Sequence, residues 1–407
     1  MNKTVLRNYA RLIARKGINV KKGQEVLLYT QLDQPEFVKM LTEECYRAGA
    51  GRVRVEWSYD PLVKLHARWQ TQKKLSETTD WERAKLQYMV DTLPARIYLE
   101  SSDPDGLEGI AQPKYSRAIQ ARATVQKPYR DAIEGKHQWC IAAVPGEKWA
   151  KKMYPDLRKN QAIEQLWKDI LSASRADGDA VAAWDAHNRE LHERCEYLNS
   201  LDLRSLHYKA QNGTDFTVGL IPGAQFLGGS EETLDGVEYN PNIPSEEIFI
   251  TPMAGKAEGI VYSTKPLSFM GQLIENFSLR FENGRVTEVK AEKNEALLQE
   301  IVKMDERAAM LGECALIPKE SPISASGLLF YSTLFDENAS CHLALGDGFE
   351  NCIPGYEKYT REQLTEMGIN SSIIHEDFMI GCDTMDIDGI SADGRVIPIF
   401  RGGTWAF

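Results

Sequence analysis

The first half of the chain alternates between helix-like and strand-like spacing of its apolar residues. In residues 5–16 the apolar side chains recur at the spacing of one helix face, and Gly17 follows as a typical helix end. A second helix is predicted over residues 35–48, which Gly49 ends. Strands are predicted at residues 25–29, 52–59, 96–101 and 138–144. This rhythm predicts an N-terminal α/β domain whose sheet is mostly parallel.

The pattern changes near residues 198–205. Helical spacing fills residues 148–198, whereas the chain beyond them is richer in Gly and Pro and carries short alternating segments. Three pairs between such segments are typical of two-residue hairpin turns, namely Asn212-Gly213, Asn283-Gly284 and Asp393-Gly394. We therefore predict two domains, an N-terminal α/β domain over residues 1–200 and an antiparallel-rich α+β domain over residues 201–407.

Composition narrows the class of protein. The 407 residues include 48 Lys and Arg against 59 Asp and Glu, and the resulting net charge of −11, without any basic run, argues against a nucleic-acid partner. No Gly-rich phosphate-binding motif follows a predicted strand. The chain has neither the apolar run of a signal peptide nor the roughly 20 apolar residues of a membrane span. Its seven Cys residues are widely spaced and free of Cys-x-x-Cys motifs, as is typical of free thiols in a reducing compartment. We expect a cytoplasmic protein with no membrane partner.

Candidate chemistry is concentrated in the second predicted domain. His375 and Asp377 lie two residues apart, so on a strand they would share a face and form half of a site for a divalent metal. His342, Glu313 and the pair Glu246-Glu247 lie in the same half of the chain. Each alone has an ordinary explanation, since a His among apolar residues is usually a core residue and a Glu pair after Pro-Ser is typical of a first helical turn. Spacing alone leaves the metal site open.

Four ordered segments and both ends of the chain together resemble a known family. The segments are residues 242–252, 311–315, 333–346 and 370–381, and the matching ends are residues 9–20 and 398–407. They are similar to the signatures of the M29 family of metallo-aminopeptidases, the group of aminopeptidases S and T. The resemblance covers nearly the whole chain.

The resemblance implies a function and a ligand set. It implies two divalent ions per subunit, zinc, cobalt or manganese, which activate a water that releases the N-terminal amino acid of a peptide with a free N-terminus. It also implies a homodimer, and it places the catalytic metal-binding site in residues 201–407. The implied metal ligands are Glu247, Glu313, His342, His375 and Asp377.

Three neighbouring positions also bear on the expected site. Glu246 is the candidate general base, by analogy with other co-catalytic peptidases in which one Glu of an adjacent pair is a base and the other a ligand. The alternative is a Glu246 that is solvated or only supports a ligand. Glu376 lies between two implied ligands and is expected on the opposite face of the strand. The family carries a Tyr seven residues after the ligand His of the third segment, where this chain has Phe349. A phenyl ring can neither ligate a metal nor donate a hydrogen bond, so either Tyr356 or Tyr359 replaces the phenol or the chemistry is altered.

Two alternatives stay open at this point. His342, His375 and Asp377 alone would form the two-His-one-carboxylate triad of a non-haem iron(II) ring-cleaving dioxygenase, and the dihydroxypyridine dioxygenases resemble the same fold. Glu247 and Glu313 favour two ions and hence the peptidase. An inactive binding module with the same fold is the third possibility, and Phe349 is its support.

Overall fold

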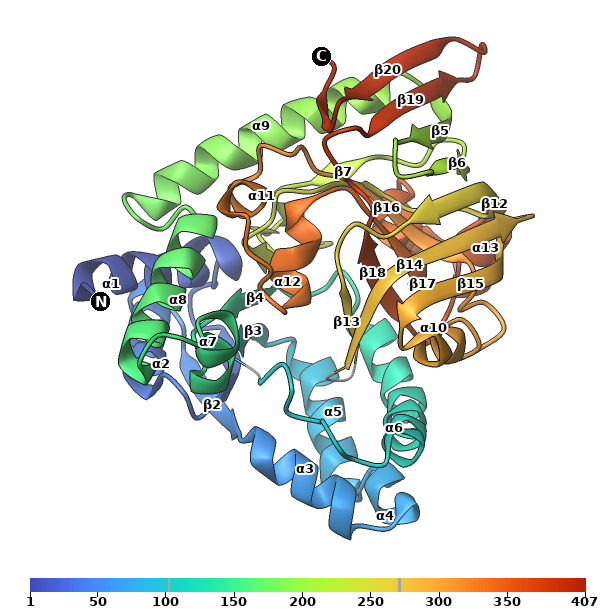
Figure 1. The fold of residues 1–407 in the computed structure, drawn as a ribbon. Helices are drawn as coiled ribbons and strands as arrows, with labels where there is room; N and C mark the ends of the chain where they lie inside the picture. The colour runs from blue at the N-terminus through green and yellow to red at the C-terminus, as the bar shows by residue number, and fades with distance from the viewer. Residues whose placement is uncertain (102, 270–271) are drawn as a thin grey trace. The chain divides into compact units, whose positions relative to one another are not determined.

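The computed structural model describes residues 1–101, 103–269 and 272–407, which divide into two compact units (Figure 1). The first unit comprises Met1–His187 and Ser230–Ser245, and the second comprises Asn188–Gly229 and Glu246–Phe407.

A parallel five-stranded sheet forms the centre of the first unit. Its strands lie in the order β10-β4-β3-β1-β2, and each neighbouring pair is parallel. The predicted parallel sheet is thereby confirmed, and the four predicted strands are all present. The strands are β1 (Glu25–Gln31), β2 (Arg52–Ser58), β3 (Ala95–Glu100), β4 (Trp139–Ala143) and the two-residue β10 (Asn242–Ile243). A small separate ladder pairs β8 (Glu231–Glu232) with β9 (Glu238–Tyr239).

Helices connect the strands of the parallel sheet, as parallel pairing requires. Both predicted helices are present, and the first continues beyond Leu12 as a π-helical turn, Ile13–Gly17. The helices are α1 (Lys3–Leu12), α2 (Pro35–Ala48), α3 (Asp60–Trp69), α4 (Gln72–Ser76), α5 (Asp80–Thr92), α6 (Gln112–Ile133), α7 (Glu147–Met153) and α8 (Lys159–Ala173), while α9 (Ala180–Ser200) contributes residues to both units.

An aromatic cluster fixes three of these helices to the sheet. Tyr9 of α1, Phe37 of α2 and Trp167 of α8 are buried. The Tyr9 ring centroid lies 5.6 Å from that of Phe37, which in turn lies 5.2 Å from that of Trp167. The Tyr9 hydroxyl donates to the Ala143 carbonyl of β4 at 3.1 Å. The hydroxyl thus satisfies its polar end at the sheet while the ring packs between helices, as buried Tyr generally does.

Antiparallel strands dominate the second unit, and the larger of its two main sheets has nine of them. Their order is β13-β14-β12-β6-β5-β19-β20-β21, with β15 paired to β14. All three predicted hairpins are confirmed, since the turns join β5 to β6, β14 to β15 and β19 to β20. At the second turn both Asn283 and Gly284 have positive φ, at 51° and 78°, which explains an Asn-Gly pair there. The strands are β5 (Leu203–Lys209), β6 (Asp215–Leu220), β12 (Pro252–Tyr262), β13 (Leu267–Phe269), β14 (Gln272–Glu282), β15 (Arg285–Lys293), β19 (Asp386–Ser391), β20 (Val396–Arg401) and β21 (Thr404–Trp405).

The smaller sheet of the second unit has five strands in the order β18-β17-β16-β11-β7, and every pairing is antiparallel. Its strands are β7 (Leu227–Gly228), β11 (Ile248–Ile250), β16 (Leu311–Leu316), β17 (His342–Gly346) and β18 (His375–Met379). One face packs in the main hydrophobic core together with side chains of the nine-stranded sheet, including Leu206, Phe216 and Phe281. The predicted antiparallel-rich second half is therefore also confirmed. Its short helices are α10 (Glu295–Ile301), α11 (Pro322–Ser326), α12 (Thr333–Asp336) and α13 (Arg361–Met367), with 3-10 turns η2 (Glu337–Ala339), η3 (Glu350–Cys352) and η4 (Tyr356–Lys358).

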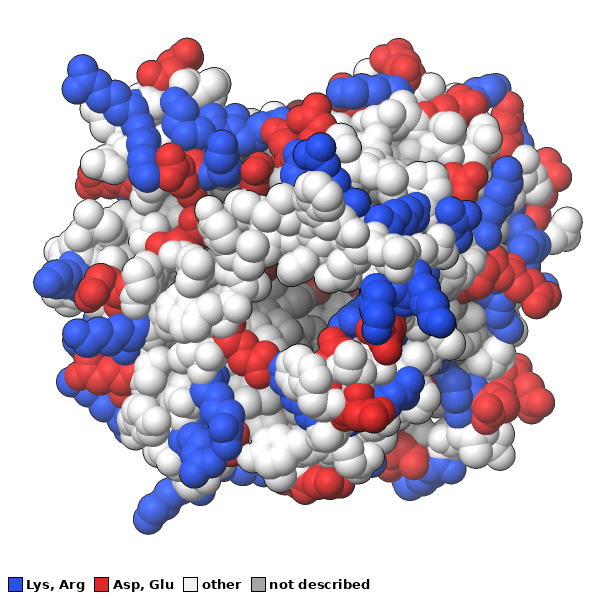
Figure 2. Space-filling view, turned by 90° about the horizontal axis from the view of Figure 1, so that it is seen from below, with Lys and Arg blue, Asp and Glu red and all other residues white. Residues whose placement is uncertain are grey.

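The remaining features are the surface charges, the hydropathy of the helices and the thiols. Acidic and basic side chains are interspersed over the face that Figure 2 shows. Among the described helices, none combines the length and the hydropathy that crossing a bilayer requires. All seven Cys residues are free thiols, and six of them are buried.

Candidate metal centre

Strand alternation places the candidate ligands on one face of the five-stranded sheet. Ala344 of β17 lies opposite Glu313 of β16 on one side and opposite Asp377 of β18 on the other. Because side chains of directly paired residues point to the same face, Glu313 and Asp377 project to one side, flanking a methyl group. The period of two adds His342 and His375 to that face.

The opposite face of the same strands is apolar. Leu343, Leu345 and Phe378 alternate with the polar residues and belong to the main core. Glu376 lies opposite Leu345, so it points away from the polar face, as expected from the sequence. Burial, and then the charge of Asp377, raises the pKa of Glu376 to about 8.

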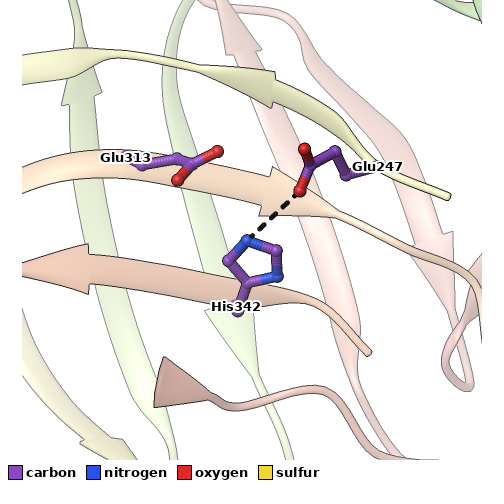
Figure 3. A group of neighbouring side chains, drawn as sticks. All are labelled: Glu247, Glu313 and His342. Carbon is purple, nitrogen blue, oxygen red and sulfur yellow. Dashed lines mark ion pairs between the residues drawn. The ribbon is translucent and has the colours of Figure 1, made fainter. Parts of the chain in front are cut away.

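Five of the six candidate site residues converge on the polar face in two overlapping groups. Ligand atoms of Glu247, Glu313 and His342 lie within 4.8 Å of one another, and so do those of Glu313, His375 and Asp377. Figure 3 shows the first group, with the carboxylate of Glu247, which directly precedes β11, facing the imidazole of His342. Glu313 belongs to both groups.

The distances between ligand atoms connect the two groups. His342 Nε2 lies 3.6 Å from Glu247 Oε2 and 3.9 Å from Asp377 Oδ1. His375 Nε2 lies 3.1 Å from Glu313 Oε2 and 3.3 Å from Asp377 Oδ1. Both ε-nitrogens thus face carboxylate oxygens.

Each imidazole is oriented by a main-chain carbonyl on its other side. His342 Nδ1 lies 2.9 Å from the Glu337 carbonyl oxygen, and His375 Nδ1 lies 2.7 Å from that of Asp347. A carbonyl oxygen only accepts hydrogen bonds, so each Nδ1 carries the hydrogen and the Nε2 of a neutral ring presents its lone pair to the carboxylates. A positive charge among these groups, either a proton on an imidazole or a metal ion, would offset the charge of the carboxylates.

The electrostatics of the site favour a positive charge beside the carboxylates. Burial lowers the pKa of His375, but the carboxylates of Asp377 and Glu313 outweigh burial and raise it well above its usual range. Conversely, burial raises the pKa of Asp377, yet the imidazoles, His375 foremost, bring it down to about 2. Asp377 Oδ1 is buried without a hydrogen-bond donor among the described residues. The site thus offers three carboxylates, including that of Asp377, and two imidazoles. This set of ligands fits divalent ions such as zinc, cobalt or manganese.

Glu246, the candidate base, is buried and directly precedes Glu247. Its side chain is outside both ligand groups. Its main-chain N–H donates to Oδ1 of Asn338 at 2.7 Å, and the Asn338 amide nitrogen donates to the Leu334 carbonyl at 2.9 Å. Asn338 is completely buried, so it fixes the backbone from which both Glu246 and Glu247 project.

Phe349, which stands where the family carries Tyr, contacts a candidate ligand. Its ring centroid lies 4.9 Å from that of His375 and 5.1 Å from that of Phe249. Its main-chain N–H donates to Thr251 Oγ1 at 2.7 Å. Tyr356 packs instead against a separate cluster of apolar residues, and Tyr359 is 41% exposed. The aromatic ring beside His375 is thus that of residue 349 itself.

Phe349→Tyr is therefore expected to raise kcat or leave it unchanged, because the ring already lies against His375 and the substitution adds a phenol that can donate a hydrogen bond. The measurement is kcat for an aminoacyl-nitroanilide after saturation with cobalt. Phe349→Leu serves as the comparison, since it removes the ring without adding a donor. A loss of more than about tenfold in the Tyr variant, or about 1.4 kcal/mol of barrier, would instead assign Phe349 a packing or substrate role of its own.

Sequence reasoning missed the groups that orient the ligands. Glu337 and Asp347 accept the imidazole hydrogens through main-chain carbonyls, an interaction that any residue type can provide. The available signal was the Gly346-Asp347-Gly348 sequence, because glycines on both sides of a polar residue often mark a close backbone approach. Asn338 lies inside residues 333–346, one of the segments that resemble the family. The role of its buried amide is evident only from the contacts in the structure.

Similarity to known proteins identifies the family of this chain. A profile of the thermophilic metalloproteases (M29) matches residues 2–405. Aminopeptidase AmpS of Bacillus subtilis is 41% identical over 404 residues, which cover 99% of this chain and 98% of that protein. The structure of wild-type AmpT from Thermus thermophilus matches with a TM-score of 0.90 at 37% identity, covering 100% of both chains.

A second structural match is more distant. The 2,5-dihydroxypyridine dioxygenase of Pseudomonas putida KT2440 matches 99% of this chain and 96% of its own, with a TM-score of 0.50 and 13% identity. At that identity the likeness concerns the fold alone. The family match spans almost the whole chain, and the resemblance expected from the sequence is confirmed. This chain belongs to the M29 family of thermophilic metalloproteases.

Proposed function

We propose that this protein is a metal-dependent aminopeptidase that removes single residues from the free N-termini of peptides, with two divalent ions per chain. The observation that carries the proposal is the pair of ligand groups that share Glu313. Membership of a metalloprotease family and relatives that are named aminopeptidases support the reaction class.

The proposed roles follow the geometry of the two groups. Glu247 and His342 would hold one ion, His375 and Asp377 the other, and Glu313 would bridge them. Ions bound there would polarise the scissile carbonyl and lower the pKa of a coordinated water toward about 7, from about 15.7 in bulk water. The main-chain carbonyls of Glu337 and Asp347 keep the two imidazoles in the tautomer that binds metal.

Glu246 is the proposed general base. It is buried and adjoins the proposed ligand Glu247, so its carboxylate would take a proton from the attacking water and return it to the leaving amine. The hydrogen bond from its N–H to Asn338 limits the positions that this carboxylate can occupy.

A ring-cleaving iron(II) dioxygenase is the second candidate. It is favoured by Asp377 Oδ1, which lies within 4 Å of the ε-nitrogens of both His342 and His375, as a two-His-one-carboxylate triad requires. Glu247 and Glu313 argue against it. They add two carboxylates to the same ligand groups, whereas the triad uses only that of Asp377.

The two candidates are separated by reconstituting metal-free protein with cobalt, zinc, manganese or ferrous iron. Hydrolysis of aminoacyl-nitroanilides and oxygen uptake with a hydroxylated pyridine are measured in parallel. We expect hydrolysis with cobalt, zinc or manganese, its loss on chelation, and no oxygen uptake. Iron-dependent oxygen uptake without hydrolysis would establish the dioxygenase, and silence in both assays would indicate an inactive binding protein.

We further propose a cytoplasmic homodimer. Seven thiols without a disulfide suit a reducing compartment. The homodimer rests on the family resemblance, and sedimentation of the purified chain measures it directly.

A further inference from the structure

The loop that orients His375 carries a glycine on each side of Asp347. The Asp347 carbonyl oxygen accepts the hydrogen on His375 Nδ1. Gly346 has φ +104°, and a Cβ at this position would lie 2.1 Å from the Ile374 carbonyl oxygen. A Cβ at Gly312, the residue before Glu313, would lie 2.0 Å from the Asp347 carbonyl oxygen itself. The loop thus approaches its neighbours closely, and other contacts must hold it in place.

Those contacts connect the loop to the segment that precedes β18. The Asp347 N–H donates to the Ile374 carbonyl at 2.6 Å, and Asp347 Oδ1 accepts from the Ser372 N–H at 2.9 Å. Asn370 is completely buried and donates to the Gly346 carbonyl at 2.6 Å. Asp347 therefore contacts the chain leading to His375 through its N–H, its carboxylate and its carbonyl oxygen.

One guanidinium group joins this loop to two other segments. Arg361, the first residue of α13, forms ion pairs with the carboxylates of Asp347 and Glu350, and its Nε donates to Ser371 Oγ at 3.3 Å. A planar guanidinium can make these three contacts at once, whereas the single ammonium of Lys cannot reproduce them. The side chain is 25% exposed, so the ion pairs are partly shielded from water.

We propose that Arg361 is a positioning residue of the metal centre: by holding the Asp347 carboxylate it fixes the carbonyl that orients His375. The imidazole of His342 depends on a different acceptor, the Glu337 carbonyl of η2. The influence of Arg361 therefore falls mainly on the ion that His375 and Asp377 would hold, and less on the ion of Glu247 and His342, which would share Glu313 with it. This inference rests on the proposed two-metal function.

The test is a cobalt titration of metal-free Arg361→Gln by calorimetry, with the cobalt absorption spectrum as a second readout. We expect two ions in the wild type. In the variant one ion should bind about 10–100-fold more weakly, the usual cost of losing a group that orients a ligand, and the other should lose clearly less affinity. In Arg361→Ala, added guanidinium ion should restore part of the weakened affinity.

Arg401→Gln is the matched control, because Arg401 also pairs with a carboxylate, that of Asp388, and donates to a main-chain carbonyl in the same unit, away from the ligand groups. Both of its cobalt affinities should equal those of the wild type. Asp347→Asn replaces Arg361→Gln should the latter fail to fold, since its amide oxygen still accepts from Ser372 while the charge is lost.

Two results would overturn the inference about Arg361. In the first, the folded Arg361 or Asp347 variants bind both cobalt ions with wild-type affinity. In the second, the affinities for both ions fall by the same factor. Failure of the wild type to bind two cobalt ions would instead overturn the proposed function.

Discussion

Glu313→Gln is expected to abolish metal-dependent hydrolysis and to leave the chain folded. Glu313 belongs to both ligand groups and is almost fully buried, so a neutral amide would remove the negative charge that the two proposed ions would share. We expect loss of both ions on gel filtration and a fall in kcat/KM that exceeds the roughly 10–100-fold cost of residues that only orient ligands. Metal content by plasma emission and hydrolysis of an aminoacyl-nitroanilide measure the two effects.

Glu376→Gln is the control for this substitution. Glu376 lies on β18 of the same sheet but opposite the core residue Leu345, so it points away from the ligand groups. The substitution keeps the volume of the side chain and leaves the ligand face unchanged, so metal content and kcat should remain those of the wild type. Two ions bound by a folded Glu313→Gln protein at wild-type affinity would contradict the shared-carboxylate arrangement.

Glu246→Gln is expected to slow the chemistry while the metal stays bound. A general base contributes about 10²–10⁴-fold to the rate, so kcat should fall by about that factor with two ions still present. The neutral amide retains the volume of the side chain and the main-chain hydrogen bond to Asn338. The measurements are kcat across pH and metal content per chain.

The Glu247→Gln variant is the comparison for Glu246→Gln. Glu247 belongs to the ligand group of His342, so its substitution should weaken the binding of one ion. Substitution of Glu246 would then lower the rate, whereas substitution of Glu247 would lower the affinity for metal. A metal-depleted Glu246→Gln protein would show that Glu246 is a ligand, and unchanged kcat would show that another group is the base.

Much of the fold could be predicted because the relevant patterns are local. The alternation of apolar residues located β1 to β4, and the Asn-Gly and Asp-Gly pairs located three hairpins. The period of two also assigned His375 and Asp377 to one strand face and Glu376 to the other. In each case a few consecutive residues contain the whole signal.

The remaining features depend on contacts between distant residues. The two-residue strand β10 is too short to show a period, so nothing in the sequence predicts its parallel pairing with β4. The interactions of Arg361 with Asp347, Glu350 and Ser371 join three segments, and a surface-like Arg at the start of a short helix gives no indication of them. The convergence of Glu247 and Glu313 with the two histidines was likewise reached through family resemblance, since their spacing matches no metal motif.

The central claim is that two divalent ions share the carboxylate of Glu313. Anomalous diffraction from crystals grown with cobalt tests it most directly, because each bound ion gives its own peak. We predict two peaks per chain on the polar face of the five-stranded sheet, one beside Glu247 and His342, the other beside His375 and Asp377, and both in contact with Glu313. A single peak among His342, His375 and Asp377, or no peak at these residues, would contradict the account.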